Sequence, residues 1–151
     1  MSREKKQPGK EPRGKLNVLF VAGFGPIGRD LESSGKLYVQ TLGIPFEKGP
    51  GGYLHTEKLD GVRHFALWPL AQASESCFGT GTWPSDLPIP QAWIEFEVED
   101  IEEATAELKR KNYQLLVAAR KEPWGQTVSR LLGPEGLLVG ITHTPWMRGK
   151  G

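Results

Sequence analysis

A helix-start pattern occurs twice in the chain at one spacing, and this repeat limits the folds that are possible. Asp30-Leu31-Glu32 precedes Leu42 by 12 positions, and Asp100-Ile101-Glu102 precedes Asn112 by the same number. An apolar strand-like run comes before each copy, and short β-like segments broken by Gly and Pro follow it. The sequence therefore predicts an α+β fold of two β-α-β-β-β modules, neither of which could bury its apolar face alone.

The repeat divides the chain into two modules and three connecting or terminal parts. We expect a disordered basic arm at 1–14, the first module at 15–68, an inter-module loop at 69–90, the second module at 91–143 and a tail at 144–151. Helices are predicted at 30–42 and 100–111, and strands at 16–22, 92–98, 114–119, 126–132 and 137–143, with three more short strands inside 44–68. The loop is rich in Ser, Thr, Gly and Pro, and connections of this length are usually functional or exchanged between partners.

Composition excludes several classes of partner. The 151 residues include 19 basic and 18 acidic side chains, and the net charge of +1 offers no electrostatic footprint for nucleic acid. No apolar run approaches the length of a membrane span, so a membrane partner is not expected. Cys77 is the single cysteine, which excludes an intramolecular disulfide and favours a reducing, cytoplasmic location.

Strand parity predicts which side chains face away from the helices. Alternate residues of a strand point to opposite faces, and each helix must cover an apolar face. In the strand at 93–98 this rule assigns Ile94, Phe96 and Val98 to the helix side. The side chains predicted on the opposite face are Trp93, Glu95 and Glu97 from that strand, and His64, Ala66 and Trp68 from the strand near 63–68.

Three motifs in a fixed order carry a resemblance to a known family. They are the pattern from Asp30 through Ser34, Leu37-Tyr38 and Leu42-Gly43, then Pro123-Trp124-Gly125 before a strand, and then the Gly133-Pro134-Glu135-Gly136 turn. Over about residues 16–143 the chain resembles the vicinal oxygen chelate superfamily, which includes glyoxalase I, extradiol dioxygenases, fosfomycin-modifying enzymes and bleomycin resistance proteins. The resemblance implies that the sheets curl around a shared ligand cleft, with Leu138, Gly140 and Thr142 of the last strand facing it.

The metal ligands of that family have no counterpart here. The resemblance implies one ligand on the first and one on the last strand of each module, typically two His and two Glu or Gln. These positions fall on Gly23, Ala66, Trp93 and Gly140, and none of these side chains can bind a divalent metal. We therefore predict no metal and no cofactor, which disfavours an enzyme, although an alignment shifted by two residues would place His64 at a ligand position.

Other candidate groups for catalysis are weaker. Glu95 is the best candidate acid/base group, because burial against Trp93 would raise its pKa. His55, His64 and His143 are interpreted as ordinary core or pocket histidines, since one imidazole makes no metal site.

Two apparent motifs are interpreted as incidental. Gly23-Phe24-Gly25-Pro26-Ile27-Gly28 matches a dinucleotide-binding pattern, but Pro26 removes an amide that a pyrophosphate would use, and consecutive β segments follow. Cys77 has no sequence-adjacent His that could activate a catalytic thiol, so we interpret it as an incidental loop cysteine.

The favoured function is a metal-free small-molecule binding protein, similar to the bleomycin-resistance branch that sequesters an antibiotic. The predicted ligand-binding residues are His64, Trp68, Phe78, Trp83, Trp93, Glu95, Gly140 and Thr142. In that branch the ligand commonly lies between protomers, so we predict a homodimer in which the 69–90 loop reaches the partner. The alternatives are a lyase, dioxygenase or transferase of the same superfamily that uses shifted ligands or an acid/base Glu, and a degenerate module that serves only as an interaction scaffold.

Overall fold

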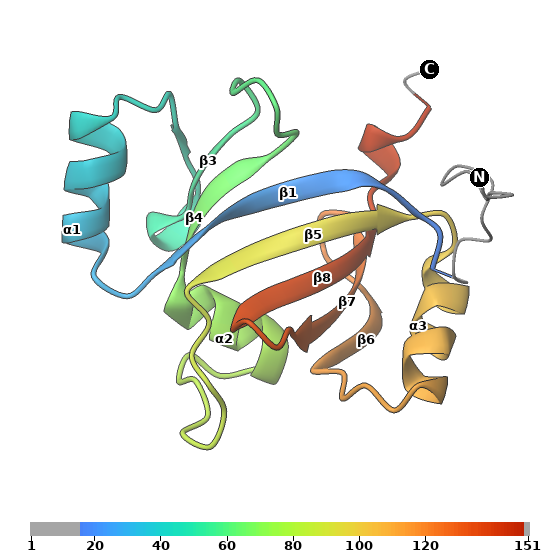
Figure 1. Cartoon of the computed structure of the whole chain (residues 1–151). Coiled ribbons are helices and arrows are strands. Elements are labelled where there is room, and N and C mark those ends of the chain that lie inside the picture. Colours follow the sequence, from blue (N-terminus) through green and yellow to red (C-terminus); the bar gives the residue numbers. More distant parts are fainter. Residues whose placement is uncertain (1–15, 150–151) are drawn as a thin grey trace, which may run out of the picture.

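A computed structural model describes residues 16–149, and one eight-stranded sheet forms its centre (Figure 1). The strands are β1 Val18–Gly28, β2 Glu47–Lys48, β3 Leu54–Thr56, β4 Phe65–Pro69, β5 Ala92–Val98, β6 Val117–Lys121, β7 Thr127–Leu132 and β8 Leu137–His143. The helices are α1 Leu31–Gly35, the π-helix η2 Lys36–Thr41, the 3-10 turn η3 Pro50–Gly52, α2 Leu70–Phe78, α3 Ile101–Arg110 and the 3-10 turn η4 Pro145–Met147. The predicted arm at 1–14 lies outside the described residues.

The strand order β2-β3-β4-β1-β5-β8-β7-β6 confirms the predicted α+β fold of two β-α-β-β-β modules. Each module pairs its first strand in parallel with its last, β1 with β4 and β5 with β8. The modules meet where β1 and β5 run antiparallel, with Gly23 opposite Glu95 and Gly25 opposite Trp93. The two modules therefore pair within one chain, and one continuous sheet carries side chains from both.

The two copies of the repeated pattern perform the same structural role. Asp30 caps α1 by accepting a hydrogen bond from the Ser33 amide at 3.1 Å, and Asp100 caps α3 in the same way from the Glu103 amide at 3.0 Å. Hydrogen bonds from Ser33 also hold the pKa of Asp30 below its usual value. The repeat is thus a pair of helix N-caps.

The two helices that follow these caps differ in packing. α3 buries Ile101, Ala104, Thr105 and Leu108 against the sheet, whereas neither α1 nor η2 has a buried residue. The expected continuous helix at 30–42 is instead a short α-helix that continues as a π-helix. Figure 1 shows α1 and α3 at opposite ends of the sheet, with the central strands between them.

The segment 69–90, expected to be a loop, contains helix α2, and this is a correction. The helix begins directly after β4 and ends at Gly79, whose φ of 77° is the left-handed conformation that favours glycine. Cys77 lies on this helix and is buried, and burial raises the pKa of its thiol. Among the described residues, no helix has the length and apolarity to cross a membrane.

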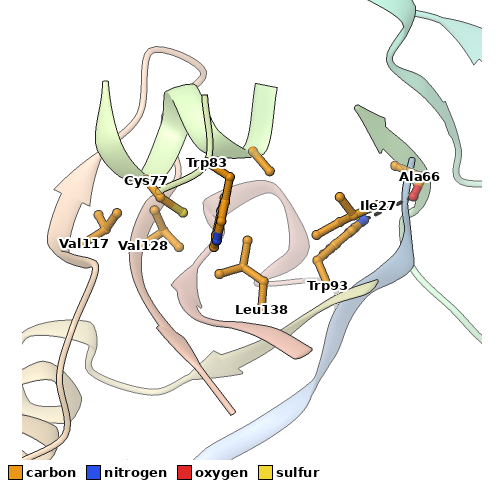
Figure 2. Packing of buried hydrophobic residues seen from close by; sticks show 9 residues of the cluster. Ile27, Ala66, Cys77, Trp83, Trp93, Val117, Val128 and Leu138 are labelled. Carbon is orange, nitrogen blue, oxygen red and sulfur yellow. Dashed lines mark hydrogen bonds between the residues drawn. The ribbon is translucent and has the colours of Figure 1, made fainter. Parts of the chain in front are cut away.

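Phe78 and Trp83 were expected to bind the ligand, on a loop that reaches a partner protomer. In the structure Trp83 belongs to the chain's own core, and Phe78 packs against that core. Trp83 is 7% exposed, and its ring meets that of Phe78 edge-on with the centroids 4.9 Å apart. Figure 2 shows Trp83 in the middle of the core cluster beneath α2, near Cys77 and Leu138. A sequence rich in Ser, Thr, Gly and Pro concealed this helix, because its buried side, with Ala73, Ser74 and Cys77, is made of small residues.

The Gly23–Gly28 motif is part of strand β1, which extends beyond the predicted end at residue 22. Gly25 lies so close to β4 that a Cβ there would stand 1.9 Å from the Ala66 carbonyl oxygen. The glycine is needed for this close approach of two strands. The structure agrees with the interpretation that the motif is not a dinucleotide-binding turn.

Candidate functional site

A cavity of about 400 Å³ opens on the face of the sheet that carries side chains from both modules. Rings make up much of its wall: Tyr53, His55, His64, Trp68, Trp93, Trp124 and Trp146. The polar groups that line it are Glu57, Gln72, Glu95, Gln126, Arg130 and Thr144. Aromatic walls with a few converging polar groups are typical of small-molecule sites.

The structure brings four of the eight predicted ligand-binding residues to this cavity. His64, Trp68, Trp93 and Glu95 line it. Phe78 and Trp83 lie in the core, as described above. Gly140 and Thr142 lie beneath the lining: a Cβ on Gly140 would meet Glu95 Cγ at 2.8 Å, and Thr142 donates a 2.8 Å hydrogen bond to the buried Glu97.

A buried ion pair forms the floor of the cavity. Arg130, on β7, is 2% exposed, and its Nη1 lies 3.2 Å from Glu95 Oε2. The other Glu95 oxygen accepts a 3.1 Å hydrogen bond from Gln126, and the Trp68 ring lies 4.9 Å from the Arg130 guanidinium carbon. Arg130 Nε is covered from solvent and has no hydrogen-bond partner among the described residues.

Tyr53, His55, Glu57 and His64 form one side of the cavity. The three rings stack, with centroids 5.5 Å apart from Tyr53 to His55 and from His55 to His64. His64 Nδ1 pairs with Glu57, and its Nε2 shares a 2.6 Å hydrogen bond with the Tyr53 hydroxyl. Burial, followed by the nearby Glu95 and Glu57 charges, raises the pKa of Tyr53, so the phenol stays neutral.

A second buried carboxylate anchors the C-terminal part of the cavity wall. Glu97 is 0% exposed and accepts hydrogen bonds from Thr142 Oγ1 at 2.8 Å and from the Thr144 amide at 2.5 Å. Arg148 Nε lies 3.2 Å from the same carboxylate. These contacts hold both ends of the turn η4, which presents Trp146 to the cavity.

The residues at the family's four metal positions do not fit a metal. Gly23, Ala66, Trp93 and Gly140 offer no nitrogen or oxygen ligand on their side chains. A Cβ on Gly23 would stand 2.7 Å from the Trp93 ring, and one on Gly140 would meet Glu95. Trp93 and the Arg130–Glu95 pair occupy the space that ligands from these positions would need, so no chemical step is assigned to a metal there.

Several cavity residues were missed or misread from the sequence. Arg130 had a usable signal, because a cation in the middle of a predicted strand is unusual and needs a buried partner. Glu57 lies in the 44–68 region, where strands were predicted without bounds, and Trp146 lies in the predicted tail, so side-chain parity placed neither residue. Trp124, noted in the sequence only as part of the Pro123-Trp124-Gly125 motif, is largely exposed at the cavity wall, where its Nε1 donates to Gln126 at 3.1 Å.

Comparisons with known proteins agree with this architecture. A family model described as the Glyoxalase/Bleomycin resistance protein/Dioxygenase superfamily matches residues 27–141, whereas no curated protein matches the sequence. A solved superfamily member from Vibrio splendidus 12B01 is similar with a TM-score of 0.56 and 18% identity, over 84% of this chain and 100% of its own. An NAD-dependent benzaldehyde dehydrogenase from Legionella pneumophila has a TM-score of 0.50 and 11% identity, over 80% of this chain and 96% of its own. At such identities the structural likeness shows the fold alone.

Proposed function

The chain belongs to the glyoxalase/bleomycin resistance protein/dioxygenase superfamily, and on this premise we propose that its cavity binds a planar small molecule, such as an aromatic antibiotic, without a metal at the family positions. The observation that supports the proposal is that aromatic rings fill the space beside those positions. Trp93 lies over Gly23, and its ring meets that of Trp68 edge-on at 6.2 Å. Rigid rings of this kind supply apolar contact area at a low cost in conformational entropy.

The floor of the cavity supports a ligand with a polar edge. The Arg130–Glu95 pair has no net charge, so it does not select strongly for a charged molecule. The oxygens of Glu95 and Gln126 line the cavity, and their remaining lone pairs can accept hydrogen bonds from a ligand. We propose a ring system that carries hydroxyl or amine donors on one side.

Removing an exposed aromatic ring from the cavity wall is expected to weaken ligand binding without affecting the fold. Trp124 and Trp146 are 56% and 52% exposed, so Trp124→Ala and Trp146→Ala should each lower affinity about fivefold, or about 1 kcal/mol, through lost ring contacts. The measurement is a titration of a panel of planar aromatic compounds by calorimetry in the presence of EDTA.

Tyr113→Ala is the matched control, because Tyr113 is equally exposed and does not line the cavity. Its affinity for any bound compound should equal that of the wild type. Failure of the wild-type chain to bind any compound of the panel would contradict the proposal and favour an interaction scaffold.

The alternative proposal, an enzyme that uses Glu95 as its acid/base group, has less support. Both oxygens of Glu95 are already hydrogen-bonded, one to Gln126 and one to Arg130. These contacts hold the carboxylate in the floor, where a substrate proton would have to reach a remaining lone pair of one oxygen. The enzyme would be favoured if the wild type turned over a substrate and Glu95→Gln abolished that turnover while still binding the ligand.

We also propose a homodimer, now with a different contact surface. Phe78 and Trp83 are core residues, but large apolar side chains are exposed on β1 and along α1 and η2: Val18, Leu19, Val21, Phe24, Leu31, Leu37 and Val39. Exposed apolar patches commonly mark protein contacts. Light scattering is expected to give twice the chain mass, and Val21→Lys should weaken dimerisation at least about tenfold by placing a charge in the contact. A monomeric wild type, or equal loss in Tyr113→Lys, would contradict this surface.

A further inference from the structure

We propose that His55, Glu57 and His64 form a binding site for a divalent transition metal, most naturally Zn²⁺, in the side wall of the cavity. One ligand atom of each residue lies within 4.8 Å of those of the other two. Two imidazoles and one carboxylate are a donor set that binds zinc while leaving a coordination position open. The fold brings these residues together from strand β3 and the segment between β3 and β4.

The existing contacts already converge on one point. Glu57 Oε2 pairs with Nδ1 of both histidines, at 3.4 Å from His55 and more closely with His64. One carboxylate oxygen therefore contacts both imidazoles. A metal ion placed among them would use the two Nδ1 atoms and the carboxylate with a small rearrangement of side chains.

The neighbours of His64 are those that a metal-binding histidine needs. A histidine that binds metal through Nδ1 carries its proton on Nε2, and this proton needs an acceptor. The Tyr53 hydroxyl lies 2.6 Å from His64 Nε2 and can accept that hydrogen bond through its oxygen. The stack of Tyr53, His55 and His64 also restricts the orientations of both imidazoles. Such positioning lowers the entropy that metal binding costs.

The site differs from the four family positions and is open to the cavity. His55 and Glu57 lie on β3 and just after it, not on the first or last strand of a module. All three donors line the cavity, and the Glu57 side chain is 50% exposed. A metal held here could therefore bind an oxygen or nitrogen of the same small molecule that contacts the aromatic wall.

The test is metal binding by the full chain without an affinity tag. After EDTA treatment and dialysis, calorimetry with Zn²⁺ is expected to show about one ion per chain. Co²⁺ should give visible ligand-field bands that Zn²⁺ removes. His55→Ala, His64→Ala and Glu57→Ala should each weaken zinc binding at least about 100-fold, and Tyr53→Phe about 10- to 100-fold through the loss of the second-shell hydrogen bond.

His143→Ala is the matched control, because this histidine lies at the end of β8 and does not line the cavity. It should bind zinc like the wild type. The proposal is overturned if the wild type binds no zinc at micromolar concentration, if His143→Ala loses as much affinity as His64→Ala, or if Glu57→Ala binds normally. Should a histidine variant unfold by circular dichroism, Glu57→Ala decides, because its half-exposed side chain contributes little to folding. Ligand titrations in EDTA test the proposed binding function separately.

Discussion

Trp93→Ala is expected to lower the free energy of unfolding by about 3–5 kcal/mol, the range measured when a large buried aromatic residue is truncated. Trp93 is 3% exposed, belongs to the core cluster with Ile27 and Ala66, and donates a 3.1 Å hydrogen bond to the Ala66 carbonyl (Figure 2). Its removal leaves a void above Gly23 and an unpaired carbonyl oxygen. Urea denaturation followed by circular dichroism measures the loss, and ligand affinity should fall in the folded variant because one cavity wall is missing.

Trp146→Ala separates the structural role from the binding role of a cavity tryptophan. This ring is half exposed and lies on the terminal turn, so its removal should change stability by no more than about 0.5 kcal/mol. Ligand affinity should nevertheless fall. If Trp93→Ala were no less stable than Trp146→Ala, the packing described for Trp93 would be wrong.

Glu97→Ala is expected to destabilise the chain by a similar amount, about 3–5 kcal/mol, the cost of breaking a buried ion pair by removing one partner. The substitution removes the carboxylate that accepts from the Thr142 hydroxyl and the Thr144 amide, and it removes the ion-pair partner of Arg148 Nε. A buried donor that loses its partner keeps its full desolvation cost. The turn η4 should also lose its anchor, so ligand affinity is expected to fall along with stability in the same denaturation and titration experiments.

Glu75→Ala is the control for this substitution, because Glu75 is exposed on α2 and alanine is the best helix former. Its stability should lie within about 0.5 kcal/mol of the wild type. Unchanged stability in Glu97→Ala would show that the network around Glu97 contributes no net stability.

Residues at the centre of the sheet fit one another in pairs. Small residues at two metal positions, Gly23 and Gly140, leave room for Trp93 and for the Arg130–Glu95 pair. A larger side chain at Gly23 would collide with the Trp93 ring, and one at Gly140 would collide with Glu95. The cavity is thus lined by aromatic rings and by the Arg130–Glu95 ion pair.

Local rules accounted for the parts of the fold that depend on neighbouring residues in the chain. The helix starts at Asp30 and Asp100 were predicted from a local pattern, and the structure shows both residues as N-caps, which act over only three positions. Strand parity correctly placed Phe96 and Val98 beside α3, and Trp93 and Glu95 on the cavity side, because the two-residue period of a strand is geometric.

The sequence by itself therefore determined the module order, the caps and the alternating faces, all of which depend on short-range geometry. Only the tertiary structure decided that 69–90 contains a buried helix, that Arg130 pairs with Glu95, and that His55, Glu57 and His64 converge. These contacts join residues that are far apart in the sequence, and strand pairing and the course of the loops bring them together. The free energy of a buried charge depends on its partner, which lies elsewhere in the chain. The periodicity of a single segment carries no information about that partner.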